Sequence, residues 1–243
     1  MSMATRYMEY LQSKIQEVLD CEIPNIEKAA QLMTESCLKG GRIYAFGSGH
    51  SHLIVEEMYI RAGGLALVHA VLPPEMMLDS MATKSTLLER LEGYAPALVE
   101  LYHIDEKDTL LVISNSGRNA VPVEMCMEAK ARGASVVALT SMKHSSASAS
   151  RHSSGKKMYE IADVVIDNHA EIGDAGLHVD GLVQPIGPVS DGTGIAIAQA
   201  LVCEVIERMI KAGVEPPVFY SSNVDGGDEK NAALFEKYYG YWK

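Results

Sequence analysis

The sequence lacks the features of several common protein classes. Its 32 Asp and Glu residues outnumber its 21 Lys and Arg residues, which gives a formal net charge of −11. A protein that binds nucleic acid or an anionic membrane needs the opposite balance, so neither partner is expected. No stretch reaches about 18 apolar residues without a polar interruption, and the N-terminal residues lack the basic and apolar regions of a signal peptide. We therefore expect neither a membrane span nor secretion.

The cysteines also exclude two classes of site. The four of them lie far apart and form no C-x-x-C pair, which excludes a zinc ribbon and a thioredoxin-type motif. A reduced, cytoplasmic setting fits this usage. With 47% hydrophobic and 22% charged residues, the composition is that of a globular protein. Because no repeat and no break in composition is visible, we expect one domain over residues 1–243.

Short apolar runs alternate with helical patterns through the middle of the chain. This alternation predicts a parallel sheet built from strand–helix–strand units, with strands that helices cover on both faces. We expect two leading helices within residues 3–39 and further helices at about 51–62, 86–102, 119–132 and 191–212. The five expected strands are residues 42–46, 65–69, 109–113, 135–139 and 162–166.

Two segments do not follow this pattern. Residues 168–189 contain four glycines and two prolines, and they predict an ordered loop without regular structure. The first half of that loop holds two histidines and three carboxylates, but their spacing matches no metal motif. We therefore expect no metal site, although this loop stays open as a candidate for one. The Ser-rich tract 144–155 predicts a mobile surface loop.

Two serine-rich turns follow expected strands and precede expected helices. The first is Gly47-Ser48-Gly49-His50-Ser51, and the second is Ser114-Asn115-Ser116-Gly117-Arg118-Asn119. Ligands of open parallel sheets bind beyond the carboxyl ends of the strands. Glycine permits tight turns, Ser51 can cap the next helix, and a helix N-terminus favours an anion. The two turns together predict an anion site.

The same turns lack the marks of nucleotide sites. Leu53 stands where a dinucleotide-binding turn has its third glycine, and no lysine follows as in a P-loop. Hydroxyl and N–H groups without such a lysine suit a single phosphomonoester.

With these turns, the chain resembles the SIS (sugar isomerase) domain family over about residues 25–215, and within it bacterial proteins labelled phosphoheptose-isomerase-like. The resemblance implies a flavodoxin-like three-layer αβα sandwich with a five-stranded parallel sheet in the order 2-1-3-4-5. Extra N-terminal helices and a C-terminal tail would be added to it. The resemblance also implies a homodimer, or a dimer of dimers, whose sites share residues between neighbouring chains.

The resemblance carries the phosphate-binding residues over to the two turns. It implies side-chain hydrogen bonds to phosphate from four residues and a backbone N–H from a fifth, Asn115. Ser48 and Gly49 complete the expected set, and His50 is the expected sugar contact. The four residues with side-chain hydrogen bonds are Ser51, Ser114, Ser116 and Asn119.

Isomerisation of a sugar phosphate needs a base at C2, and two carboxylates compete for that role. Glu204 lies on the last long helix, where amino-sugar phosphate isomerases of the family place their catalytic Glu, but it can instead pair with Arg208. Phosphoheptose isomerases and the family's etherase keep a catalytic Glu where this chain has Arg61. Glu57 lies one turn earlier, as a displaced base or as the partner of Arg61.

His178, or alternatively His169, is the expected group for ring opening or proton transfer. The resulting expectation is a sugar-phosphate aldose–ketose isomerase that works through a cis-enediol and needs no cofactor. Two alternatives stay open because a fold does not determine a reaction. One is a non-catalytic sugar-phosphate sensor, and the other is a lyase that resembles N-acetylmuramic acid 6-phosphate etherase.

Overall fold

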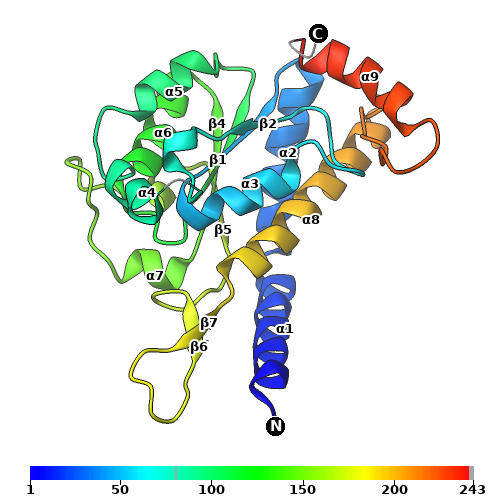
Figure 1. Cartoon of the computed structure of the whole chain (residues 1–243). Coiled ribbons are helices and arrows are strands. Elements are labelled where there is room, and N and C mark those ends of the chain that lie inside the picture. The colour runs from blue at the N-terminus through cyan, green and yellow to red at the C-terminus, as the bar shows by residue number, and fades with distance from the viewer. Residues whose placement is uncertain (80, 241–243) are drawn as a thin grey trace.

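The computed structural model describes residues 1–79 and 81–240, and its centre is a five-stranded parallel sheet in the order β2-β1-β3-β4-β5 (Figure 1). This is the strand order that the resemblance implied, so the expected fold class is confirmed. Each expected strand is found, shifted by three residues or fewer. The strands are β1 (Ile43–Gly47), β2 (Val68–Val71), β3 (Thr109–Ile113), β4 (Ser135–Thr140) and β5 (Val164–Asp167).

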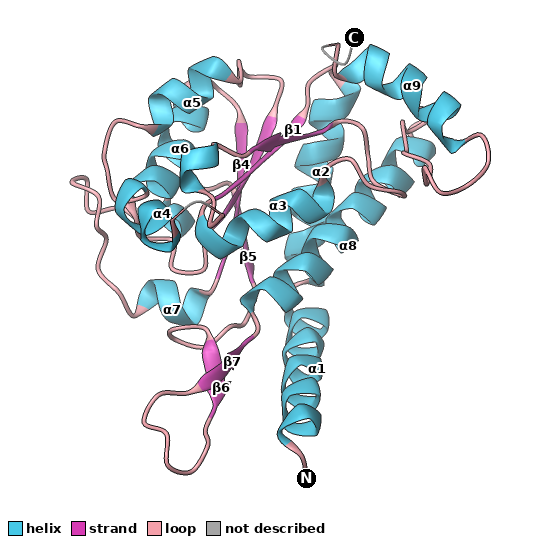
Figure 2. Ribbon diagram, in the orientation of Figure 1, coloured by secondary structure: helices cyan, strands magenta, loops and turns pink. Residues whose placement is uncertain are grey.

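Helices cover both faces of the sheet and make two separate cores (Figure 2). Alternate residues of one strand enter different cores: Ala45 of β1 packs into the first, and Tyr44 and Phe46 into the second. The first core lies under α2 (Ile23–Leu38), α3 (His52–Met58) and α8 (Ser190–Lys211), and the second under α5 (Ala95–Leu101) and α6 (Ala120–Ala131).

The helix expected at 86–102 is instead two short helices, α4 (Ala82–Leu88) and α5. α4 already ends at Leu88, and Gly93 lies between the two helices with a φ of +87°, a left-handed conformation that a continuous helix does not contain. Its N–H donates to both carboxylate oxygens of Glu124, at 2.8 and 2.9 Å. The break frees residues 89–94 to form a turn.

Residues 168–189 are more regular than expected, because they contain the hairpin of β6 (Ala175–Leu177) and β7 (Ile186–Pro188). The hairpin projects from the body beside α1 (Met3–Cys21), as Figure 1 shows. Tyr7 of α1 donates its hydroxyl to the Pro188 carbonyl at 2.8 Å. The remaining elements are α7 (Met142–Ser146), α9 (Gly227–Tyr238) and the 3-10 turns Gly49–Ser51, Pro74–Met76 and Met158–Glu160.

Within residues 1–79 and 81–240, no helix combines the length and apolar character needed to cross a membrane.

Candidate functional site

The two serine-rich turns meet at one end of the sheet and enclose a cavity of about 370 Å³. They are neighbours because β1 and β3 pair directly, with Gly47 opposite Ile113, the last residues of the two strands. The cavity brings together all of the residues expected to bind phosphate, and also His50. Its lining is Ser48, Gly49, His50, Ser51, Leu78, Ser85, Thr86, Glu89, Ser114, Asn115, Ser116, Asn119 and His144.

Glycines shape both turns. Gly49 and Gly117 have φ values of +57° and +58°, which residues with a Cβ atom rarely adopt. A Cβ on Gly117 would lie 3.0 Å from the hydroxyl oxygens of Thr140 and Ser145, so the second turn also needs the small residue for space. The Ser114 hydroxyl accepts the Gly117 N–H at 3.2 Å and keeps its own proton for another acceptor. Ser51 stands at the start of α3, but its side chain makes no capping hydrogen bond in the described structure, contrary to the expectation.

Glu89 is the carboxylate that reaches this cavity. Ser48 donates its hydroxyl to Oε2, and Asn119 donates from Nδ2 to Oε1, both at 2.6 Å. Burial raises the pKa of the Glu89 carboxyl above its ordinary value, although these two hydrogen bonds oppose the shift. A carboxyl whose pKa is raised toward neutrality can take up and release protons, as a general base must.

The three residues expected to act in catalysis lie elsewhere in this chain. Glu57 of α3 pairs with Arg61, which lies beyond the end of that helix, and Glu204 pairs with Arg208 on α8 at 2.8 Å. His178 is exposed in the hairpin region, where its carbonyl accepts from Arg6 at 3.1 Å. None of the three belongs to the cavity lining formed by the described residues. The ion pairs of Glu57 and Glu204 are the alternatives that the sequence offered.

The sequence analysis missed five residues of the cavity lining, of which Glu89 and His144 are titratable and the others are Leu78, Ser85 and Thr86. Glu89 was placed inside a continuous helix, and the signal against that helix was Gly93. His144 was placed in a surface tract. Burial, and then the nearby Arg118 guanidinium, lower the pKa of His144, which keeps the imidazole neutral near neutral pH. A neutral imidazole can both donate and accept a proton.

Two of the carboxylates in the 168–189 segment are engaged with other protein groups. Glu171 pairs with Lys14 and Lys143, and Asp174 accepts from the N–H groups that begin α8. Nδ1 and Nε2 of His169 face different carboxylates. Among residues 1–79 and 81–240, the one group of three His, Cys, Asp or Glu side chains whose donor atoms converge is elsewhere: Glu92, Glu124 and His152.

Comparison with known proteins places this geometry in a family. The chain matches the SIS domain family over residues 6–141. It is 50% identical, over 234 residues, to a UPF0309 protein from Halalkalibacterium halodurans, and the match covers 96% of this chain and 97% of that relative.

Two solved structures share the fold. Phosphoheptose isomerase GmhA from Neisseria gonorrhoeae superposes with a TM-score of 0.56 at 19% identity. The match covers 85% of this chain and 100% of that one. The Vibrio vulnificus NanR protein complexed with ManNAc-6P has a TM-score of 0.56 at 13% identity, over 97% of this chain and 70% of that one. At such identities the likeness establishes the fold alone. From the family match and the 50% identical relative, this chain belongs to the SIS domain family and to the UPF0309 proteins.

Proposed function

We propose that this chain binds a phosphorylated sugar in the cavity between the two turns. The hydroxyls of Ser51, Ser114 and Ser116 and the backbone N–H groups of both turns would hold the phosphate. Asn119 lines the same cavity, but its amide is already engaged with Glu89 and Arg151. The two structural neighbours support this ligand class, since one is a phosphoheptose isomerase and the other was solved with ManNAc-6P.

The reaction that the site supports best is aldose–ketose isomerisation, and Glu89 is the observation that carries it. Glu89 lies against both turns, since it accepts hydrogen bonds from Ser48 and Asn119, so a sugar phosphate bound in this cavity would lie beside this carboxylate. Glu89 would remove the proton from C2 while the carbonyl oxygen O1 takes up a proton, which gives a cis-enediol. It would then return its proton to C1 while O2 loses one. Ser48 and Asn119 fix both carboxylate oxygens, so the base is held in one orientation. His144 and His50 line the same space and are candidates for proton transfer at the ring oxygen.

A site shared between two chains would be needed for a role of Glu57, Glu204 and His178. Because they do not line the cavity of their own chain, each would act only in the site of a second copy. A homodimer with shared sites is therefore part of the proposal for these three residues, and Glu89 needs no second copy.

The deciding experiment is proton NMR in D2O with phosphorylated hexoses, heptoses, amino sugars and N-acetylmuramic acid 6-phosphate. Deuterium entry at C2 or C1 with aldose–ketose conversion would establish the isomerase and identify its substrate. Release of lactate would establish the etherase reaction instead. Saturable line broadening without turnover would establish a sugar-phosphate sensor. The same assay on Glu89→Gln, Glu57→Gln, Glu204→Gln and His178→Gln would identify the base.

The phosphate site has a separate test. Ser116→Ala removes one hydroxyl from the second turn, and hydrogen bonds to charged groups contribute about 1.5–3 kcal/mol. We expect roughly 10- to 100-fold weaker binding of every phosphosugar, because the phosphate is common to them all. Thr86→Val is a control on the same cavity wall outside both turns. An unchanged affinity in Ser116→Ala would remove the proposed phosphate site, whatever reaction the protein catalyses.

A further inference from the structure

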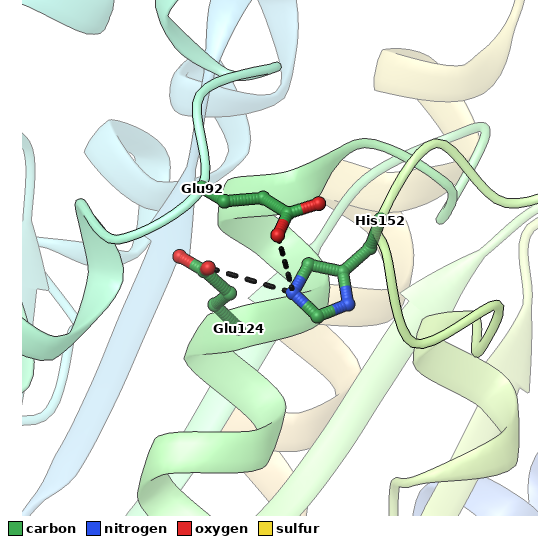
Figure 3. Close-up of side chains that lie close together, drawn as sticks. All are labelled: Glu92, Glu124 and His152. Carbon is green, nitrogen blue, oxygen red and sulfur yellow. Dashed lines mark ion pairs between the residues drawn. The ribbon is translucent and has the colours of Figure 1, made fainter.

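Three side chains from separate segments meet beside α6. Glu92 comes from the 89–94 turn, Glu124 from α6, and His152 from the loop between α7 and the turn Met158–Glu160. Figure 3 shows both carboxylates directed at the same nitrogen of the imidazole. This convergence brings together parts of the chain that are distant in sequence.

The distances within the cluster are too long for good hydrogen bonds. Nε2 of His152 lies 3.5 Å from Oε1 of Glu124 and 3.8 Å from Oε2 of Glu92. Hydrogen bonds from nitrogen to oxygen have separations of about 2.7–3.2 Å. In tetrahedral zinc sites the metal–ligand distances are about 2.0–2.2 Å, which places neighbouring N and O ligands about 3.4 Å apart. The spacing of the cluster therefore resembles that of two ligands around a metal ion.

Hydrogen bonds orient each of the three side chains. Nδ1 of His152 accepts the Ser154 N–H at 3.2 Å and lies 2.7 Å from the Ser154 hydroxyl oxygen, so Ser154 orients the ring. A metal ion at Nε2 would require the ring proton to move to Nδ1, where the Ser154 hydroxyl oxygen would accept it. Ser153 donates its N–H and its hydroxyl to Glu92, at 2.6 and 2.7 Å. The Gly93 N–H fixes Glu124 from the opposite side. Metal-binding side chains in proteins are commonly oriented in this way.

The charge of the cluster is not balanced by lysine or arginine. The side chains of Glu124 and His152 are only 11% and 9% exposed. Within the described part of the chain, the recorded ion pairs of Glu92 and Glu124 are with His152 alone. Hydrogen bonds from Ser153 and Gly93 offset part of the cost of these charges, and a bound cation would offset more of it. Two carboxylates and an imidazole form a donor set that a divalent cation can bind.

We propose that Glu92, Glu124 and His152 bind a divalent transition-metal ion, with Zn²⁺ as the probe that best matches their chemistry. The ion would fasten the loop that carries His152 to α6 and to the 89–94 turn. This site is separate from the sugar-phosphate cavity and does not depend on the proposed reaction. Two connections lead to that cavity: Arg151 donates to Oδ1 of Asn119 at 2.9 Å, and the 89–94 turn carries both Glu92 and the cavity residue Glu89.

The test is calorimetric titration of the full, untagged, chelator-treated chain with ZnCl₂, together with Co²⁺ absorption as a report of tetrahedral coordination. We expect one ion per chain and an upward shift of the melting temperature. His152→Gln and Glu92→Gln should each weaken Zn²⁺ binding at least about tenfold. The Glu92 side chain is 42% exposed, so its variant should fold even if His152→Gln does not.

His169→Gln is the matched control, because His169 also lies among carboxylates but directs its two nitrogens at different ones. Its Zn²⁺ affinity should equal that of the unmodified chain. Loss of binding in His169→Gln alone would place the ion in the other cluster and overturn the proposal. Equal affinity in the chain and in both cluster variants would show adventitious binding. The absence of any saturable Zn²⁺ binding would also overturn the proposal.

Discussion

The side chain of Glu89 is buried, and burial disfavours the charged form of its carboxyl group. Burial raises its pKa, so the folded chain binds this proton more tightly than the unfolded chain does. The stability that protonation contributes is complete below the ordinary pKa of glutamate, about 4.3, and is lost as the pH rises through the higher folded pKa. At neutral pH the ionised Glu89 therefore contributes less to the stability of the fold than the protonated form would.

Glu89→Gln tests both aspects of this residue. The amide keeps partners for Ser48 and Asn119 but cannot accept the C2 proton. If the chain is an isomerase, kcat should fall roughly 10²- to 10⁴-fold. The free energy of unfolding should match that of the unmodified chain at about pH 4 and exceed it at about pH 8. Urea unfolding at both pH values measures this difference.

Glu100→Gln is the control, because this carboxylate is 71% exposed and should show no comparable change. If Glu89→Gln were less stable than the unmodified chain at the higher pH, the ionised carboxylate would be stabilising, and the argument from burial would be wrong.

At the scale of elements, the sequence predicted what is determined locally. Strands buried on both faces are continuous apolar runs, and the two serine-rich turns carry their glycines and hydroxyls within six residues. The break at Gly93 and the hairpin β6–β7 depend on contacts with Glu124 and Tyr7, which are far away in the chain. Glu89 directly follows α4 and lines the cavity together with Ser85 and Thr86, and this placement depends on how α4 packs, which local patterns do not reveal.

Asp174 shows how one such contact supports a long helix. Its carboxylate accepts from the backbone N–H groups of Val189 and Ser190, at 3.1 and 2.8 Å, and from the Ser190 hydroxyl at 2.7 Å. It thereby caps α8 from the hairpin side, even though its own φ is +74°.

Asp174→Ala should destabilise the chain by about 1–2 kcal/mol, as the loss of a helix cap does. Asp174→Asn, which keeps an acceptor oxygen and tolerates the backbone conformation, should lose less. Urea unfolding compares the two variants, and hydrogen exchange should show faster opening in the first turn of α8. If both variants were as stable as the unmodified chain, the hydrogen bonds to Asp174 would contribute little to stability.

At the scale of the whole molecule, the apolar surface of α1 is only partly covered by other elements. Met8, Ile15 and Leu19 of α1 are 63%, 40% and 56% exposed, and their spacing places them near one another on the helix surface. Figure 1 shows α1 extending beyond the sheet and its helical layers. An apolar stripe of this kind is typical of a surface that another chain covers.

We expect a homodimer by light scattering after gel filtration, and Leu19→Asp should shift it toward the monomer because a buried charge without a partner is costly. Leu101→Asp is the control, since Leu101 is 71% exposed on α5, on the other side of the sheet. A monomeric unmodified chain would remove this interface, and with it any shared role for Glu57, Glu204 and His178.

The direct pairing of β1 with β3 makes the cavity a property of the complete fold. Its two walls come from strands separated by β2, α4 and α5 in the chain, and no short fragment contains both. A ligand that needs both walls binds the native state and not the unfolded one, so it shifts the folding equilibrium of the entire sheet. At 100 times its Kd, such a ligand adds about 2.7 kcal/mol to the free energy of unfolding. Melting temperatures measured across a panel of sugar phosphates would therefore rank the physiological ligand before any reaction is known.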